Sequence, residues 1–322
     1  MTPGPLVADP SRVRLGIAGR VDENDHPYSW SAIVNGYDPV AMSAHAHPMI
    51  SQYLGARRAD EFGIEGVRVT HVWCDDPEDA RKIAGASRIE TIVNRAEDLI
   101  GCVDAVLIPT DRGEEHAARA RPFVEAGVPA FIDKPLCDNR QDLRQFARWI
   151  EEQRRPILSC SALRFANEYD ALRAARDEIG NLRLVTAVMA KSWRRYGIHA
   201  LEAAYTLCPP GGWLSAAHAG GDGSDIVRYR HRDGTQLLVC VGDDWFGGFG
   251  VVTAYGTSGH RSAQFRDSFT AFKRQLTAFV EYLRTGCPPF GFEQTRELMQ
   301  MLIAGLESRR RGGATVELNE LR

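Results

Sequence analysis

Short apolar segments alternate with helix-forming segments between residues 13 and 135, and this alternation constrains the fold more than any other feature. Apolar runs at 13–18, 67–74, 103–108 and 130–132 have the length and composition of buried strands. Strands that alternate with helices in this way typically form a doubly wound parallel sheet. We therefore predict an α/β fold whose first domain is built on such a sheet.

A second feature is the segment Ala130-Phe131-Ile132-Asp133-Lys134-Pro135-Leu136, which ends the last of these strands. Pro135 disfavours a helical conformation for the residue before it, so Lys134 is expected in an extended or turn conformation. Ligands bind at this edge of an open α/β sheet. A partly desolvated lysine there can donate a proton or polarise a carbonyl group, and an ordinary solvated lysine is the alternative interpretation.

The residues around Lys134 extend this pattern. The run Val103-Asp104-Ala105-Val106-Leu107-Ile108-Pro109-Thr110 precedes His116, and Glu125-Ala126-Gly127-Val128-Pro129 follows it. Together with Asp133-Lys134-Pro135-Leu136, these stretches resemble the DAVxIxTP…H…AGxxVxxEKPL pattern of the Gfo/Idh/MocA family, which includes glucose-fructose oxidoreductase and inositol dehydrogenase. Asp133 stands in place of the family's glutamate, and Pro109-Thr110 reverses its Thr-Pro order. The resemblance is strongest over residues 101–145 and reaches both ends of the chain.

This resemblance implies both a fold and an activity. The fold is an N-terminal Rossmann domain followed by an α+β C-terminal domain with a mainly antiparallel sheet. The activity is that of an NAD- or NADP-dependent oxidoreductase, in which Lys134 is catalytic and also contacts the cofactor. Pro109, Thr110 and His116 are then expected to lie in the cofactor site.

The domain boundaries follow from the same resemblance. We expect the dinucleotide-binding domain over residues 12–137 and a substrate and oligomerisation domain over residues 138–291. The helix at 292–311 is expected to pack back on the first domain. In the family the C-terminal sheet often mediates assembly, so a homodimer or homotetramer is expected.

The first strand runs into a glycine turn, where a dinucleotide-binding domain carries G-x-G-x-x-G so that the backbone can approach the diphosphate. Gly19 matches the first glycine and Gly16 precedes it, but Val21 and Asn24 occupy the positions of the second and third. The loop instead carries several acids and His26, which is similar to an Asp-x-x-His loop of some family members. Acids beside a diphosphate are unfavourable unless they point away. We expect Gly16, Gly19 and His26 to contact the cofactor.

The choice between NAD and NADP depends on the end of the second strand, where an acid binds the ribose hydroxyls. The family's D-R-D-P pattern can be laid on Cys74-Asp75-Asp76-Pro77 in two registers, with either Cys74 or Asp75 at the position of the acid. Asp75 favours NAD, because a carboxylate repels a 2′-phosphate. NADP stays open as the alternative.

The second domain carries the other catalytic candidate. The segment Arg195-Tyr196-Gly197-Ile198-His199-Ala200-Leu201-Glu202 resembles the family's D-x-G-x-H-x-x-D element, whose histidine is an acid/base beside the nicotinamide. His199 matches that histidine, whereas Arg195 replaces the first aspartate and Glu202 replaces the last. An arginine cannot accept a proton, but its charge would disfavour protonation of His199 and attract an anionic substrate group.

Polar and aromatic residues near this element suit a sugar, cyclitol or sugar-acid substrate. The expected substrate-binding residues are Lys191, Trp193, Arg195, Tyr196 and His199. Arg164, in Leu163-Arg164-Phe165, resembles the family's RFxPxY motif. It either binds substrate or caps the joint between the domains.

Composition excludes several partners and sites. The 322-residue chain has a formal net charge of −3 and no basic run long enough to indicate a nucleic-acid interface. Its seven cysteines are odd in number and show no Cys-x-x-Cys spacing, which indicates a reducing compartment and no zinc site. His45 and His47 have no acid or cysteine at metal-ligand spacing, so a polar loop is expected there and no metal is predicted.

The expected location is the cytoplasm. No segment approaches the ~20 apolar residues that a membrane span needs. Residues 1–9 lack a charged start followed by an apolar core, so they are predicted to be a short disordered leader and not a signal peptide.

These features together predict hydride transfer between a nicotinamide and a hydroxyl or ketone of a carbohydrate-like molecule. Lys134 would polarise the oxygen, while His199 or a water that it holds takes the proton. The broken glycine loop and Arg195 leave two alternatives open. One is a lyase, epimerase or hydrolase on the same fold, and the other is a cofactor-free binding protein.

Overall fold

The computed structural model describes residues 4–321, which form two compact units. The first unit contains the chain up to Asp133, together with Phe146–Ser159 and Phe272–Phe290. The second contains Lys134–Gln145, Cys160–Ala271 and the chain from Gly291 onward. Each unit is therefore assembled from separate stretches of the sequence.

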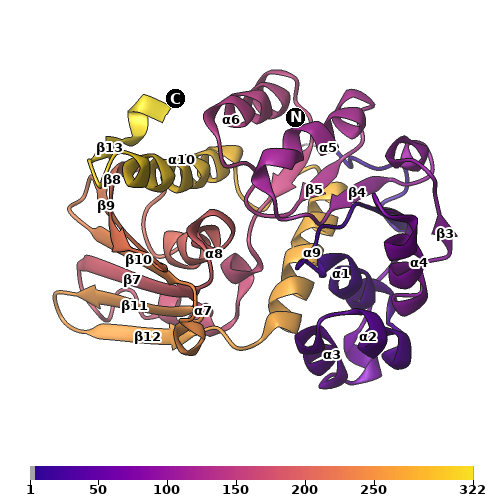
Figure 1. Ribbon diagram of the computed structural model, residues 1–322, viewed down its shortest axis with the longest axis horizontal. Helices are drawn as coiled ribbons and strands as arrows, with labels where there is room; N and C mark the ends of the chain where they lie inside the picture. Colours follow the sequence, from indigo (N-terminus) through magenta and orange to yellow (C-terminus); the bar gives the residue numbers. More distant parts are fainter. Residues whose placement is uncertain (1–3, 322) are drawn as a thin grey trace. The chain divides into compact units, whose positions relative to one another are not determined.

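The first unit is built on a six-stranded sheet (Figure 1). Its strands are β1 (Val13–Ala18), β2 (Val67–Trp73), β3 (Thr91–Ile92), β4 (Ala105–Ile108), β5 (Ala130–Ile132) and β6 (Ile157–Ser159). All neighbouring strands are parallel, and they lie in the order β3-β2-β1-β4-β5-β6. This is the doubly wound order, in which ligands bind beyond the carboxyl ends of the strands near the switch between β1 and β4. The predicted Rossmann domain is confirmed.

Helices α1 (His26–Asn35), α4 (Pro77–Ala86) and α5 (Gly113–Glu125) lie between the strands of this sheet in the sequence. A polar loop was expected around His45 and His47, but residues 36–66 contain α2 (Pro39–His45), α3 (Pro48–Gly55) and a short 3₁₀ turn. Both helices are capped, because Asp38 Oδ1 accepts the N–H of Ala41 at 2.8 Å and His47 Nδ1 accepts that of Met49 at 3.2 Å. His47 is therefore a helix cap.

The helix that follows β5 changes its geometry along its length. Helix α6 spans Arg140–Ala147, and a π-helical turn continues it over Arg148–Glu152. The wider turn brings Trp149 to the buried side in place of Ile150, which is only half-buried.

The second unit is built on a seven-stranded sheet in the order β12-β11-β7-β10-β9-β8-β13. Its strands are β7 (Leu182–Ala190), β8 (Trp213–Gly221), β9 (Ser224–His231), β10 (Gln236–Gly242), β11 (Val251–Gly256), β12 (His260–Gln264) and β13 (Val316–Glu317). Strands β7 and β10 pair in parallel, and the other neighbours are antiparallel. The predicted mainly antiparallel sheet is confirmed.

The structure corrects the predicted role of the closing helix. Helix α10 (Phe292–Arg310) belongs to the second unit, where it packs against β8 and against α8 (Trp193–Tyr205) (Figure 1). The stretch that returns to the first unit is instead Phe272–Phe290, which includes most of α9 (Ser268–Thr285). Each long amphipathic helix buries its apolar side in one of the two units, and the sequence alone did not show in which unit each helix would pack. The second unit also contains α7 (Glu168–Ala174).

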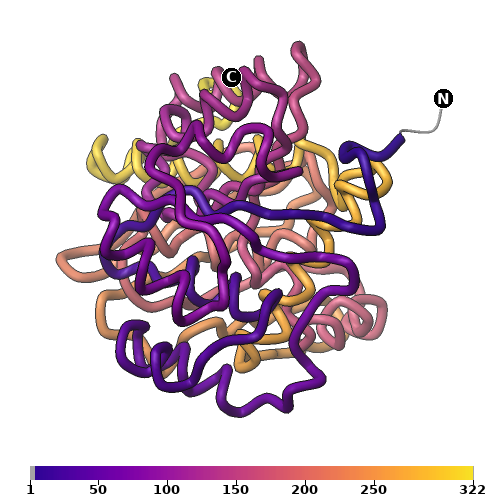
Figure 2. The backbone as a smooth tube through the Cα atoms, turned by 90° about the vertical axis from the view of Figure 1, so that its right-hand side faces the viewer, coloured from indigo at the N-terminus to yellow at the C-terminus, as the bar shows by residue number. Residues whose placement is uncertain are grey.

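The start of the chain is ordered from residue 4, so the predicted disordered leader is wrong for the residues that the structure describes. The N–H of Leu6 donates to the carbonyl of Leu283 at 2.8 Å, and Val7 is buried. Arg284 Nε donates to the carbonyl of Pro10 at 3.0 Å, so this segment runs beside the end of α9 (Figure 2). Residues 1–3 lie outside the described part.

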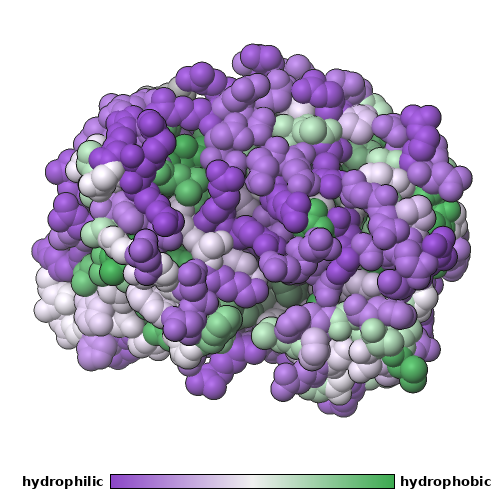
Figure 3. All heavy atoms as spheres, in the orientation of Figure 1, coloured by the Kyte–Doolittle hydropathy of each residue, from purple (hydrophilic) through white to green (hydrophobic). Residues whose placement is uncertain are grey.

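The face drawn in Figure 3 is mostly hydrophilic, with apolar side chains in small, scattered patches. Such scattered apolar residues are ordinary on protein surfaces. Within residues 4–321, no helix is both long and apolar enough to span a bilayer.

Candidate functional site

The turn after β1 has the backbone geometry of a nucleotide-binding turn. Gly19 has a φ of +104°, and its N–H donates to the carbonyl of Trp73 at 2.8 Å. A Cβ atom at Gly19 would lie 3.0 Å from Nη1 of Arg119. The turn therefore needs glycine both for its conformation and for space.

Gly16 lies within β1 and not in this turn, and its contact with the cofactor stays a prediction. A Cβ atom at Gly16 would come within 3.2–3.3 Å of Leu99 and Val103. The glycine at this position therefore allows close packing inside the unit.

The acids of the loop after Gly19 either point to solvent or are neutralised. Asp22 and Glu23 are exposed. Arg20 pairs through Nη2 with Asp25 Oδ1 at 3.0 Å and through Nη1 with Asp79 Oδ2 at 2.9 Å. The charge of the loop is thus compatible with an anionic ligand at the turn.

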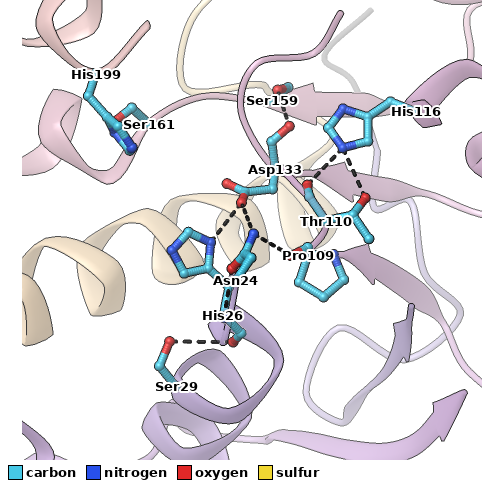
Figure 4. A network of polar contacts seen from close by, with 10 residues as sticks. All are labelled: Asn24, His26, Ser29, Pro109, Thr110, His116, Asp133, Ser159, Ser161 and His199. Carbon is cyan, nitrogen blue, oxygen red and sulfur yellow. Dashed lines mark hydrogen bonds and ion pairs between the residues drawn. The ribbon is translucent and has the colours of Figure 1, made fainter. Parts of the chain in front are cut away.

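The buried carboxylate of Asp133, after β5, binds two side chains of the same loop (Figure 4). Its Oδ2 lies 2.7 Å from His26 Nδ1 and 3.2 Å from Asn24 Nδ2. Asn24 Nδ2 also donates to the carbonyl of Pro109 at 3.0 Å, and the ring of His26 stacks on Trp30 with centroids 5.2 Å apart. Asn24, at the position of the third fingerprint glycine, therefore ties the loop to the ends of β4 and β5.

His116 holds the segment that follows β4. Its Nε2 lies 2.7 Å from the carbonyl oxygen of Thr110 and 3.1 Å from Thr110 Oγ1. Both residues are fully buried. His116 therefore fixes the backbone next to the expected cofactor site, and any effect on a cofactor passes through Thr110.

Asp75 lies just after β2, at the position where ribose hydroxyls bind in this fold. Its Oδ1 and Oδ2 atoms are 3.2 and 3.0 Å from Nη1 of Arg119. Arg119 Nε also donates to Glu115 Oε2 at 2.9 Å. Sequence analysis missed Arg119, and the signal that pointed to it was its four-residue spacing from Glu115 on one side of α5.

Lys134 is buried in the second unit and is only 2 % exposed, so the interpretation as a solvated lysine is wrong. Its Nζ lies 5.4 Å from the centre of the Tyr196 ring, within the range of a cation–π interaction. Lys191 Nζ lies 4.6 Å from the same ring and donates to Tyr196 Oη at 2.8 Å. Lys191 has a φ of +70°, a conformation that costs about 1–3 kcal/mol and is concentrated at functional sites.

His199 lies in α8 and contacts a residue that sequence analysis did not select. Its Nδ1 is 2.6 Å from Oγ of Ser161 (Figure 4), and Ser161 Oγ also accepts the N–H of Leu163 at 3.1 Å. The ring of Tyr196 is tilted against that of His199, with centroids 5.2 Å apart. Ser161 and Tyr196 therefore fix the orientation of the imidazole.

Glu202, one turn after His199, is buried and supports Ser161. Its Oε1 accepts the N–H of Ser161 at 3.3 Å, and its Oε2 lies 2.5 Å from Nε of Arg164. Burial raises the pKa of Glu202, against the lowering effect of the Arg164 charge. Arg164 also donates to Gln294 at 2.9 Å, so its guanidinium is engaged inside the second unit.

Trp193 is a core residue, which corrects its expected place in the substrate pocket. Helix α8 begins at Trp193, so the indole lies on its first turn. The indole is 2 % exposed, and its Nε1 donates to the carbonyl of Leu302 at 3.2 Å. Arg195 and Tyr196 lie on the first turn of the helix and are half-buried.

The part of the chain that the structure describes contains no group of three His, Cys, Asp or Glu side chains able to hold a metal ion. His45 is exposed, and His47 caps α3.

Residues 44–159 match the model of an oxidoreductase family with an NAD-binding Rossmann fold. The match covers the part of the chain that contains strands β2 to β6 of the first sheet. The matched model is that of the Gfo/Idh/MocA family, so the comparison agrees with the resemblance seen in the sequence. The matched stretch includes Asp75, Arg119 and Lys134, and it begins after the glycine turn.

Solved structures share this fold across almost the whole chain. A myo-inositol 2-dehydrogenase from Lactobacillus plantarum has a TM-score of 0.74 and 13% identity, covering 95% of this chain and 99% of its own. A myo-inositol dehydrogenase from Lactobacillus casei in complex with NAD(H) and myo-inositol has a TM-score of 0.71 and 15% identity, covering 95% and 96%. An oxidoreductase from Agrobacterium radiobacter in complex with NAD⁺, L-tartaric acid and magnesium has a TM-score of 0.73 and 14% identity, covering 97% and 100%. At these identities the likeness establishes the fold alone, and no curated protein has a detectably similar sequence.

Proposed function

We propose that the protein is an NAD-dependent dehydrogenase that oxidises a secondary hydroxyl of a cyclitol, sugar or sugar acid, or reduces the corresponding ketone. The observation that carries the proposal is the burial of Lys134 beside Tyr196, directly after the β5 strand of the matched domain. A buried lysine at the carboxyl edge of a doubly wound sheet is suited to polarise a substrate oxygen. Similar proteins form complexes with myo-inositol and with L-tartaric acid, which supports a polyol or hydroxy-acid substrate.

The residues of the first unit fit a dinucleotide. Gly19 leaves the turn after β1 without a side chain, and Asp75 supplies a carboxylate where ribose hydroxyls are bound. The same carboxylate favours NAD over NADP, because it would repel a 2′-phosphate. When bound, NAD would supply the hydride acceptor or donor.

The residues of the second unit fit an acid/base role. Lys134 would donate a hydrogen bond to the reacting oxygen and stabilise the negative charge that develops there. His199, oriented by Ser161, would take the hydroxyl proton or return it in the reverse direction. Lys191, Arg195 and Tyr196 would bind the hydroxyl or carboxylate groups of the substrate.

The first experiment is calorimetric titration of the purified protein with NAD⁺, NADH, NADP⁺ and NADPH, after an absorbance check for bound nucleotide. Micromolar binding of the NAD pair, followed by NADH formation with inositols, sugars or tartrate, is the expected result. If neither pair binds, the proposal of a dehydrogenase is refuted.

A non-redox lyase or epimerase is the second candidate, because Arg195 stands where a proton-accepting aspartate is expected. Tightly held NAD that does not change redox state during turnover would favour it.

We also propose that the protein works in the cytoplasm as a homodimer or homotetramer that assembles through the second sheet. All seven cysteines are free, which suits a reducing compartment. Residues of β9 and β10 alternate between buried and more exposed positions, so one face of this sheet is less covered than the other. Light scattering of the purified protein would detect a monomer and so contradict the assembly.

A further inference from the structure

The usual diphosphate-binding donors of this fold are already in use. In a dinucleotide-binding domain, the N–H groups at the start of the first helix point at the diphosphate. Here the N–H of His26 donates to Asn24 Oδ1 at 2.9 Å, and residue 27 is a proline. The N–H groups of Tyr28 and Ser29 donate to the carbonyl of Asp25 at 3.1 and 3.2 Å.

The nearest cation in the sequence is also engaged. Arg20 follows Gly19 directly, but its guanidinium is held by Asp25 and Asp79. The start of the helix and Arg20 are therefore poorly placed to bind a diphosphate, and a donor from another element would make up for them.

Arg119 of α5 lies where such a donor is required. Its Nη1 is the atom closest to a Cβ built on Gly19, at 3.0 Å, so the guanidinium lies directly against the turn. Glu115 binds it through Nε at 2.9 Å, and Asp75 binds Nη1 at 3.0 Å. These two carboxylates fix the plane of the guanidinium while the side chain stays 19% exposed.

We propose that Arg119 binds the 5′-diphosphate of the coenzyme's adenosine half and replaces the helix N–H groups in this role. The proposal rests on the proposed function and adds a residue that no motif marks. A guanidinium has five N–H donors, so it can serve a phosphate oxygen while it remains paired with a carboxylate. Asp75, which is half exposed at 51%, would then link Arg119 to the neighbouring ribose.

The alternative ligand of Arg119 is the 2′-phosphate of NADP, because an arginine near the ribose binds this phosphate in NADP-dependent proteins. The contact with Gly19 favours the diphosphate, since that glycine marks where the diphosphate passes. ADP and 2′,5′-ADP separate these two sources of phosphate, and adenosine tests binding without either.

The test compares wild type with Arg119→Gln by calorimetric titration with ADP, 2′,5′-ADP, adenosine and NAD⁺. We expect ADP and NAD⁺ to bind about 10- to 100-fold more weakly to the variant, because a hydrogen bond to a charged group is lost. Adenosine affinity should change less than twofold. Arg121→Gln is the matched control on the same helix, since Arg121 lies over Trp149 and near Glu125, and its ADP affinity should equal that of wild type.

Arg119→Lys is a second variant at the same position. Thermal unfolding of both variants checks that each of them is folded. The lysine variant keeps the charge without the planar fork, so intermediate ADP affinity supports the proposal. Unchanged ADP affinity in a folded Arg119→Gln protein overturns it, and so does a loss confined to 2′,5′-ADP. A wild-type protein that binds ADP but produces no NADH with any polyol would refute the proposed function and leave the ADP comparison valid.

Discussion

Ser161 Oγ lies 2.6 Å from His199 Nδ1, although 38 residues separate the two in the sequence. If His199 is the acid/base that we propose, Ser161 would take the orienting role of the aspartate that Arg195 replaces in the family pattern. A neutral hydroxyl can orient an imidazole, but unlike a carboxylate it does not stabilise a positive charge on it.

Ser161→Ala should therefore lower kcat about 10-fold, the effect of one hydrogen bond of about 1.5 kcal/mol. The pH at which kcat/KM changes should also shift, because Ser161 acts on the proton equilibrium of His199. Ser161→Thr keeps the hydroxyl and should restore the wild-type profile. A lower melting temperature with an unchanged pH profile would assign Ser161 a purely structural role.

Lys134→Met removes the ammonium group while keeping most of the apolar stem. If Lys134 polarises the reacting oxygen, turnover should fall about 10²-fold or more, while the affinity for NAD changes little. Initial rates and calorimetric titration of the same preparation measure both quantities. Full activity in this variant would remove Lys134 from the mechanism.

Two glycine-to-alanine variants test whether Trp193 belongs to the core. A Cβ at Gly305, in α10, would lie 2.6 Å from the buried Trp193 ring, whereas one at Gly85, in α4, would meet nothing within 4 Å. Gly305→Ala should destabilise the protein by about 1–3 kcal/mol through overpacking, and Gly85→Ala should stabilise it by up to about 1 kcal/mol through helix propensity. Urea unfolding measures both, and equal effects would contradict the core assignment.

Asp104 should make stability depend on pH. Burial raises the pKa of its carboxyl, but hydrogen bonds from the backbone and guanidinium of Arg14 outweigh burial and hold the pKa below 3.8. The native pKa lies below the unfolded value, so the stabilisation is present above pH 3.8 and is lost as the pH falls through the native pKa.

Asp104→Asn should accordingly cost about 1 kcal/mol at pH 7. The difference from wild type should shrink as the pH falls from 3.8 through the lower native pKa, because Asp104 becomes neutral first in the unfolded chain and then in the folded protein. Urea unfolding at a series of pH values provides the comparison. A difference that stays constant down to pH 3 would show that the charge of Asp104 is not responsible.

The cysteines should differ sharply in reactivity. Cys287 is exposed, whereas Cys74, Cys137, Cys160 and Cys208 are buried. Burial raises the pKa of the Cys74 and Cys208 thiols to about 12, so their reactive thiolate forms are scarce at neutral pH. A disulfide reagent should show one fast phase in the native protein, which Cys287→Ser removes. Cys102 and Cys240 are only half-buried, so the contradicting result is fast modification of Cys74, Cys137, Cys160 or Cys208 in the folded variant.

Local sequence determined much of the first unit. Short apolar runs separated by helical segments dictate a parallel sheet, because each strand buries both faces and each connection must cross over the sheet. The Asp-Lys-Pro end of β5 likewise placed Lys134 at the ligand-binding edge, since proline and strand length act within a few residues.

Tertiary structure decided which side chains meet. Arg119 reaches Asp75 across 44 residues, and Ser161 reaches His199 across 38. The indole of Trp193 lies in the core and not in the predicted pocket, because it is at the start of α8 and packs on Gly305 of α10. Such partners depend on how distant elements pack, and the 3.6-residue period of a helix does not specify its neighbour. The sequence by itself thus determined the order of elements and the position of Lys134 after β5. Packing decided which residues contact His199 and, by our proposal, which residue binds phosphate.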